Sequence, residues 1–213
     1  MLFLACFLLL QSFISVPVQA APLLSSLFSF RPRADPVCNG DAALCARKYS
    51  EVTFIGTHDS AFIGPLPTQN QEKSITDQLN SGIRFLQSQT HNFLNSLRMC
   101  HTSCPLEDGG TVENYLREVK KWMDMNPRDV VTILLTNPDK VPMSKFDAVF
   151  KKVGLDTIAF KPSTSPNPLA MGDWPTLGSI LNDGRRLITF MGTETPCRLL
   201  CLVANIVIRL RRG

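Results

Sequence analysis

Two of the chain's three histidines come directly after short runs of strand-forming residues. The run VTFIGT over residues 52–57 leads into His58 and Asp59, and the run LRMC over 97–100 leads into His101. Histidine exchanges a proton near neutral pH, so two imidazoles that face one cleft can divide acid and base work between them. A carboxylate beside an imidazole can fix its tautomer, and Asp59 is placed to do this. The pattern predicts a catalytic group of His58, Asp59 and His101.

Strand alternation decides which other side chains can join this group, because successive residues point to opposite faces. In a strand predicted over 83–90, Gln87 and Gln89 share one face, and we expect them to lie between the two histidines and to bind the substrate. His91 continues that face further out and is a weaker candidate. The alternative is three unrelated histidines, each satisfied by local hydrogen bonds.

Cysteine spacing indicates disulfides. Cys6 lies in an apolar N-terminal segment, and six cysteines remain in the rest of the chain. An even number in a secreted protein favours a disulfide framework, and close spacing suggests the local pairs Cys38–Cys45, Cys100–Cys104 and Cys197–Cys201. Two alternatives stay open at this point, a zinc site that combines cysteines with His101 and a nucleophilic thiol at Cys100.

The N-terminal segment is typical of a secretory signal peptide. Residues 2–14 are almost wholly apolar, and the small residues that follow predict cleavage after Ala20. An uncleaved anchor is the alternative, but so short an apolar run is below the length of a membrane span. We therefore expect a signal peptide over 1–20, an irregular lead-in over 21–37 and an extracellular protein.

The charge distribution argues against a nucleic-acid partner. The formal net charge is +4, yet four arginines and no acids follow Cys197, so the rest of the chain is neutral as a whole. The body of the chain has no basic stripe with interleaved aromatic residues, which a nucleic-acid-binding surface would need. The composition favours a globular domain with a sizeable core.

Predicted strands and helices alternate along the chain. Strands are expected over 52–57, 83–90, 97–101, 129–136, 157–160 and 186–191, and helices over 75–81, 112–126 and 176–182, with a further helix that Ser144 caps and Gly154 ends. Alternation of this kind predicts a parallel sheet with helices outside it. The first strand is not followed by a G-x-G-x-x-G motif, which favours an (α/β) barrel over a nucleotide-binding sheet.

Four ordered motifs carry a family resemblance, namely GTHDS, GIRFLQSQTH, LRMCHTSC and NPRDVVTILLTN. Together they resemble the X domain of phosphatidylinositol-specific phospholipase C, and more closely the secreted fungal branch of phospholipase C-like phosphodiesterases. The resemblance covers about residues 38–191 and includes the motif WPTLGSIL and the stretch GRRLITFM.

The resemblance implies an α/β fold of the TIM-type (β/α) barrel and cleavage of the phosphodiester of an inositol phospholipid. The inositol 2-hydroxyl attacks phosphorus and releases diacylglycerol, with His58 matching the general base, His101 the general acid, and Asp59 the carboxylate that orients the acid. The substrate implied is a phospholipid or another phosphodiester, met transiently at a membrane surface by a monomer.

The family also implies a cation at two positions of the second strand. Signalling members hold calcium there with acidic residues, and bacterial secreted members place an arginine there. This chain has Gln87 and Gln89 instead, and Arg84 is predicted on the opposite face of that strand. We therefore expect no metal and no other cofactor, with a glutamine amide offering a hydrogen bond to the phosphate.

The end of the chain departs from the family pattern. The barrel portion is expected over 38–194 with about six of the eight strands that a closed barrel needs, followed by an apolar, arginine-rich tail over 195–213 that does not read as barrel sequence. A membrane-surface helix in this tail is the rival interpretation. Because the barrel is incomplete, two alternatives remain. The chain could be a catalytically weak or inactive relative that binds phospholipid headgroups or a cell-surface partner, or it could fail to fold stably.

Overall fold

The computed structural model describes residues 36–164, 169–192 and 209–210, which all lie in the unit Asp35–Gly213. The predicted signal peptide over 1–20 and most of the lead-in over 21–37 lie outside the described residues. Most of the tail over 195–213, including the third proposed cysteine pair, also lies outside them.

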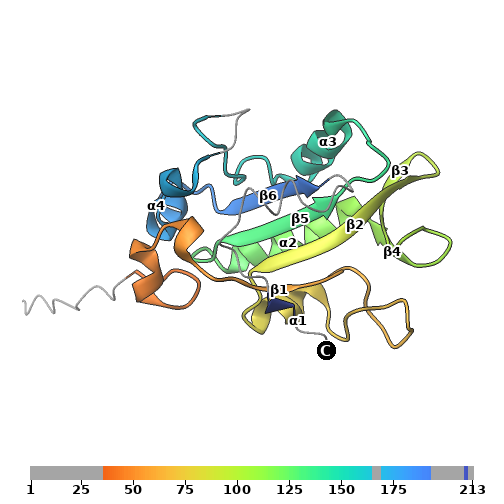
Figure 1. Cartoon of the computed structure of the whole chain (residues 1–213), viewed down its shortest axis with the longest axis horizontal. Coiled ribbons are helices and arrows are strands. Elements are labelled where there is room, and N and C mark those ends of the chain that lie inside the picture. The colour runs from red at the N-terminus through yellow and green to blue at the C-terminus, as the bar shows by residue number, and fades with distance from the viewer. Residues whose placement is uncertain (1–35, 165–168, 193–208, 211–213) are drawn as a thin grey trace, which may run out of the picture. The chain divides into compact units, whose positions relative to one another are not determined.

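A parallel sheet forms the centre of the described unit (Figure 1). Its strands run in the order β6-β5-β2-β1-β7, and every neighbouring pair is parallel. They are β1 (Ile55–Thr57), β2 (Phe85–Phe93), β5 (Val131–Thr136), β6 (Leu187–Gly192) and the two-residue β7 (Arg209–Leu210). The β-branched and aromatic runs over 52–57, 83–90, 129–136 and 186–191 therefore form strands as predicted.

The second half of β2 leaves this parallel sheet and forms an antiparallel ribbon. Residues Thr90 to Phe93 of β2 pair with β3 (Ser96–Cys100), and β3 pairs with β4 (Asp108–Thr111). The hairpin turn consists of Leu94 and Asn95, both with positive φ, the geometry that matches the twist of a two-residue hairpin. The prediction that 97–101 would be another parallel barrel strand is therefore wrong, and β4 was not predicted at all.

Four α-helices in the described residues accompany the strands: α1 (Ile75–Asn80), α2 (Val112–Met125), α3 (Met143–Val153) and α4 (Leu177–Asn182). Short 3-10 segments form at η1 (Ala42–Ala46), η2 (Tyr49–Glu51) and η3 (Met171–Asp173). Thr111 caps α2, because its side chain accepts from the Asn114 amide. Helix α3 starts before Ser144, with Pro142 at the cap position, and ends at Gly154 in the left-handed conformation.

Both faces of the sheet are buried, as expected for parallel strands. On one face, Leu86, Ile133 and Leu135 pack with the apolar stripes of α1, α2 and α3, and Figure 1 shows α2 lying behind β2 and β5. On the other face, Phe85 packs with a cluster around Tyr49 and Trp174. Gln87 and Gln89 share the face of Phe85, so the second cluster forms the floor below the candidate site.

The described strands form an open mixed sheet of seven strands. The sequence predicted a TIM-type barrel left incomplete at about six strands, and the described part of the chain shows an α/β sheet that is not closed. The weak strand predicted over 157–160 is reduced to a single bridge between Ala159 and Leu187 at the edge of β6. Of the tail that was alternatively interpreted as a membrane-surface helix, only Arg209 and Leu210 are described, and they form strand β7. None of the described helices is both long and apolar enough to cross a bilayer.

Candidate functional site

The turn that follows β1 is fixed by buried hydrogen bonds to α1 and β2. The Thr57 hydroxyl donates to Gln78 Oε1 at 2.8 Å, and Gln78 Nε2 donates to the carbonyl of Ser60 at 3.0 Å. The amide and the hydroxyl of Ser60 both donate to the carbonyl of Gln87. These bonds explain why polar residues follow the apolar strand, since each satisfies a buried polar group at the strand end.

Asp59 occupies the centre of this turn with a positive φ of 50°, a conformation that aspartate and asparagine tolerate better than most residues. Its amide donates to Gln87 Oε1 at 2.8 Å. The residue is fully buried, and its carboxylate is the group around which the two predicted catalytic histidines gather.

A single carboxylate oxygen joins both histidines. His58 Nε2 lies 3.0 Å and His101 Nε2 lies 3.4 Å from Asp59 Oδ2, although the two residues are far apart in sequence. The other oxygen, Oδ1, is buried without a hydrogen-bond partner among the described residues. The structure therefore brings His58, Asp59 and His101 together, with the His58 side chain 45% exposed and the His101 side chain 23% exposed.

The second ring nitrogen of His101 is also held. His101 Nδ1 lies 2.8 Å from the carbonyl oxygen of Thr68, which can only accept, so Nδ1 carries a hydrogen. The ring stacks on Phe62 with centroids 5.3 Å apart. Nε2 is therefore the His101 nitrogen that faces Asp59.

The two glutamines of β2 form hydrogen bonds with the candidate group. Gln87 Oε1 accepts from the Asp59 amide, as described above. Gln89 donates from Nε2 to Asp59 Oδ2 at 3.2 Å and accepts at Oε1 from the amide of Thr102, the residue after His101. Gln87 and Gln89 thus contact Asp59, the residue that both histidines share, and a role in binding substrate stays a prediction.

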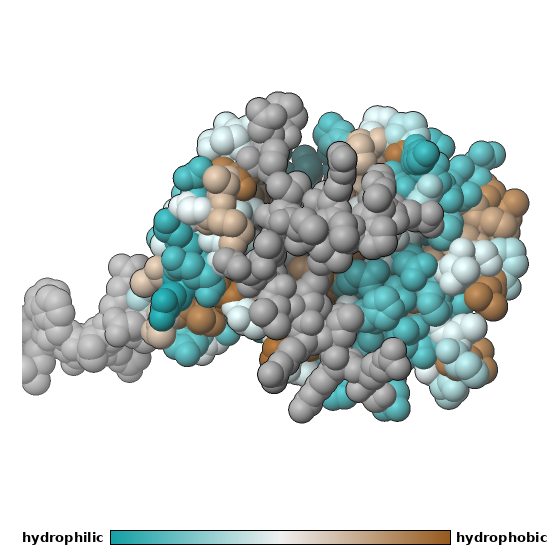
Figure 2. Space-filling view, viewed as in Figure 1, coloured by the Kyte–Doolittle hydropathy of each residue, from teal (hydrophilic) through white to brown (hydrophobic). Residues whose placement is uncertain are grey.

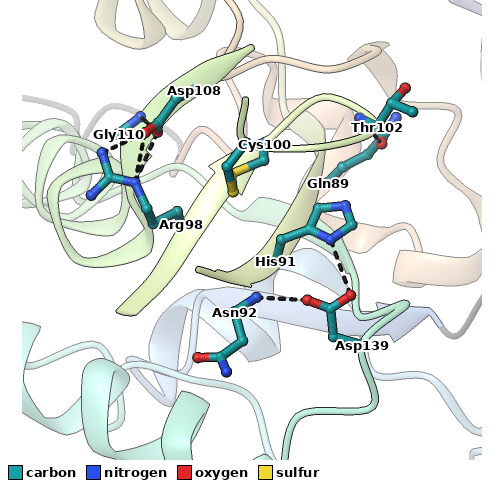
Figure 3. The surroundings of a disulfide bond; sticks show 10 residues. Gln89, His91, Asn92, Arg98, Cys100, Thr102, Asp108, Gly110 and Asp139 are labelled. Atoms are coloured by element: carbon teal, nitrogen blue, oxygen red, sulfur yellow. Dashed lines mark hydrogen bonds and ion pairs between the residues drawn. A yellow bond between two sulfur atoms is a disulfide. The ribbon is translucent and has the colours of Figure 1, made fainter. Parts of the chain in front are cut away.

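The third histidine belongs to a different pair. His91 Nδ1 lies 3.1 Å from Asp139 Oδ1, and the other oxygen of Asp139 accepts from the Asn92 amide at 2.7 Å. Figure 3 shows this pair beside the ribbon of β2 and β3, with Gln89 further along. His91 is therefore outside the His58, Asp59 and His101 group.

The two disulfides predicted within the described residues form: Cys38–Cys45 and Cys100–Cys104. The second closes the short loop that carries His101 (Figure 3). Because Cys100 is bonded to Cys104, the nucleophilic thiol and the zinc site built on these cysteines are both wrong. The described residues contain no cluster of three or more metal-binding side chains.

The residues present do not fit the calcium ion that some relatives hold. Calcium takes six to eight oxygen ligands. Here Asp59 Oδ2 is shared by two histidines, and the amide oxygens of Gln87 and Gln89 each accept from a backbone amide. Arg84 is no substitute cation, because its Nε donates to Asp129 at 2.8 Å and its guanidinium lies over Trp122 behind the sheet.

Several supporting residues had no sequence signal that pointed to the site. Gln71 Nε2 donates to the carbonyl of His58 at 2.6 Å, and Thr68 holds the His101 ring. Tyr115 is buried on α2, and its hydroxyl is 2.9 Å from the Ser60 hydroxyl. Burial raises the pKa of Tyr115, so the hydroxyl stays protonated and can share a hydrogen bond with Ser60.

Comparison with known proteins gives a consistent result. The family model described as "PI-PLC X 1" matches residues 44–201. A PI-PLC X domain-containing protein 1 of Arthroderma benhamiae is 48% identical over 162 residues, which cover 75% of this chain and 52% of that protein. An uncharacterized secreted protein of the same fungus is 40% identical over 158 residues, 74% of this chain and 35% of that protein.

A solved structure shares the fold. Phosphatidylinositol-specific phospholipase C from Listeria monocytogenes superimposes with a TM-score of 0.50 at 19% identity, over 71% of this chain and 54% of that chain. The chain therefore spans about half of the first curated relative and about half of this bacterial enzyme, and about a third of the second relative.

Proposed function

The chain belongs to the PI-PLC X domain family, and we propose that it is a secreted phosphodiesterase of phospholipase C type that acts on a phosphoinositide-like lipid. The observation that carries this proposal is the position of two imidazoles on one buried carboxylate oxygen, at 3.0 Å and 3.4 Å. A pair of imidazoles at the end of β1 and in the loop after β3 suits the transfer of two protons around one phosphorus atom.

The reaction consists of one displacement at phosphorus. His58 accepts the proton of the inositol 2-hydroxyl, whose oxygen forms a bond to phosphorus. The bond from phosphorus to the glycerol oxygen breaks, and His101 Nε2 gives its proton to that leaving oxygen. The products are a cyclic inositol phosphate and diacylglycerol, with His58 protonated and His101 neutral until water exchanges the protons.

The surroundings of Asp59 support this assignment of roles. A fully buried carboxylate is stable only beside a compensating positive charge, so we infer that one of the two histidines is an imidazolium before reaction. His101 is the better candidate, because both of its ring nitrogens face acceptors, the Thr68 carbonyl and Asp59 Oδ2. His58 then starts neutral and acts as the base.

Exposed leucines in the loops support transient contact with a lipid surface. Leu66 lies close to Thr68 in sequence, Leu94 is at the tip of the β2–β3 hairpin, and Leu106 lies in the same loop as His101. Each of these residues is more than half exposed. Figure 2 shows hydrophobic surface at the ribbon end of the visible face, interrupted by polar residues. We propose that the monomer meets its phospholipid substrate there, after removal of a signal peptide over 1–20.

Turnover of phosphatidylinositol in mixed detergent micelles tests the proposal. We expect the full chain to release water-soluble inositol phosphate. We also expect a chelator to change the rate by less than about two-fold, since the site offers far fewer than the six to eight oxygen ligands that calcium takes. Loss of all activity on chelation, restored by calcium, would contradict the assignment of the site as independent of metal.

A non-catalytic role in binding phospholipid headgroups is the second candidate. The observation that favours it is the absence of a cation at Gln87 and Gln89, whose side chains are engaged with Asp59 and Thr102. Sedimentation with phosphatidylinositol vesicles, without product and unchanged in His101→Ala, would support this role over the enzyme.

A further inference from the structure

The loop over residues 64–72 contacts both catalytic candidates. Gln71 Nε2 donates to the carbonyl of His58 at 2.6 Å, and the carbonyl of Thr68 accepts from His101 Nδ1 at 2.8 Å. The position of the His101 ring therefore depends on where this loop places the Thr68 carbonyl.

Glu107 holds that loop from the opposite side. Its carboxylate accepts from the Thr68 hydroxyl at 2.8 Å through Oε2 and from Gln69 Nε2 at 3.1 Å through Oε1. Both are hydrogen bonds to an ionised group, which are stronger than those between neutral groups. Gln69 Oε1 in turn accepts from the amide of Leu66, so the carboxylate stabilises the turn itself.

The backbone of Glu107 is tied to His101 as well. The His101 amide donates to the carbonyl of Glu107 at 3.1 Å, and Cys104, which is bonded to Cys100, lies between these two residues in sequence. These hydrogen bonds form a ring of contacts: the His101 amide bonds to Glu107, the Glu107 carboxylate bonds to Thr68, and the Thr68 carbonyl bonds to the His101 imidazole. Movement of the Glu107 side chain would therefore be transmitted to His101 Nδ1.

We propose that Glu107 is a positioning residue for His101. Through the Thr68 carbonyl, Glu107 sets the orientation of the His101 ring and therefore the direction of its Nε2 proton. This inference deepens the proposed function and rests on it for its kinetic consequence. Glu107 does not contact His101 through its side chain, so it acts only through the 64–72 loop.

A substrate whose leaving group departs without protonation distinguishes a positioning role of Glu107 from a general loss of structure. We expect Glu107→Ala to lower kcat about 10-fold on phosphatidylinositol, whose glycerol oxygen must be protonated, because a displaced general acid loses part of its contribution. On the p-nitrophenyl ester of inositol 1-phosphate we expect a change of less than about two-fold, and KM should change little on either substrate.

Matched variants sharpen the test. Thr68→Val removes the hydroxyl and should behave like Glu107→Ala, whereas Thr68→Ser keeps the hydroxyl and should retain activity. Glu72→Ala removes a charge from an exposed acid of the same loop and should leave both rates unchanged. An equal loss on both substrates in Glu107→Ala would overturn the inference.

Nitrogen-15 NMR of the histidine rings gives a readout that does not need activity. We expect the His101 ring of the wild-type chain to show Nδ1 protonated and hydrogen-bonded, and this signature to weaken in Glu107→Ala and in Thr68→Val. An unchanged His101 spectrum would overturn the inference, even if the chain proved inactive on both substrates. Inactivity with the expected spectral change would contradict the proposed function and leave the positioning role standing.

Discussion

Alanine in place of His58 or of His101 is expected to lower the turnover of phosphatidylinositol by about 10²–10⁴-fold, because each variant loses one of the two proton transfers. The double variant is expected to lose little more than either single variant, since the two residues act as one unit. The measurement is initial release of inositol phosphate by the purified full chain, with folding checked by a thermal transition.

His91→Ala is the matched control for these variants. It also removes an imidazole that pairs with a carboxylate, Asp139, but one outside the candidate group. We expect its turnover to stay within about two-fold of the wild type. Full activity in both His58→Ala and His101→Ala would rule out the acid–base mechanism, and a loss in His91→Ala as large as theirs would show that the site extends along β2.

Asparagine in place of Asp59 is expected to lower turnover by a similar factor, about 10²–10⁴-fold, while the protein stays folded. The substitution removes the charge that both histidines share, so the imidazolium loses its counter-ion and the neutral imidazole loses the acceptor that fixes its tautomer. Asparagine tolerates the positive φ of this position, and the change in the free energy of unfolding should stay within about 2 kcal/mol. The measurements are kcat and a chemical unfolding curve for the same preparation.

Asp139→Asn is the matched control, because Asp139 is the carboxylate of the other histidine pair and is more exposed. We expect little change in kcat for this variant. If Asp59→Asn kept wild-type turnover, the shared carboxylate would have no part in proton transfer, whatever its geometry.

The composition of the candidate group could be predicted from the sequence. His58 and Asp59 follow a short apolar strand, and the carboxyl ends of parallel strands meet at one edge of a sheet. Gln87 and Gln89 could be placed next to them because side-chain alternation along β2 is independent of tertiary context. The disulfide beside His101 could be predicted from spacing and a secreted context.

The way in which His101 reaches the group could not be predicted. The sequence suggested a parallel strand over 97–101, but the Leu94–Asn95 turn folds β3 back onto β2. Local strand propensity does not distinguish parallel from antiparallel pairing, and a hairpin turn without glycine gives a weak signal. His101 therefore lies in the loop that follows β3, rather than at the end of a neighbouring barrel strand.

The supporting residues were missed for a related reason. Thr68, Gln71 and Glu107 lie in irregular loops whose polar residues have no periodicity, so their contacts depend on tertiary structure alone. The sequence predicted a TIM-type barrel that is incomplete, with about six of eight strands, and the described strands form an open mixed sheet.

Phosphorus-31 NMR of the products of phosphatidylinositol cleavage identifies the group that attacks phosphorus, and so tests the acid–base mechanism of His58 and His101. We expect the full chain to form first a five-membered cyclic inositol phosphate, and His58→Ala and His101→Ala to form almost none. An acyclic inositol phosphate as the first product would rule out attack by the inositol 2-hydroxyl, and a cyclic product formed at equal rate by either histidine variant would rule out the roles of the two imidazoles.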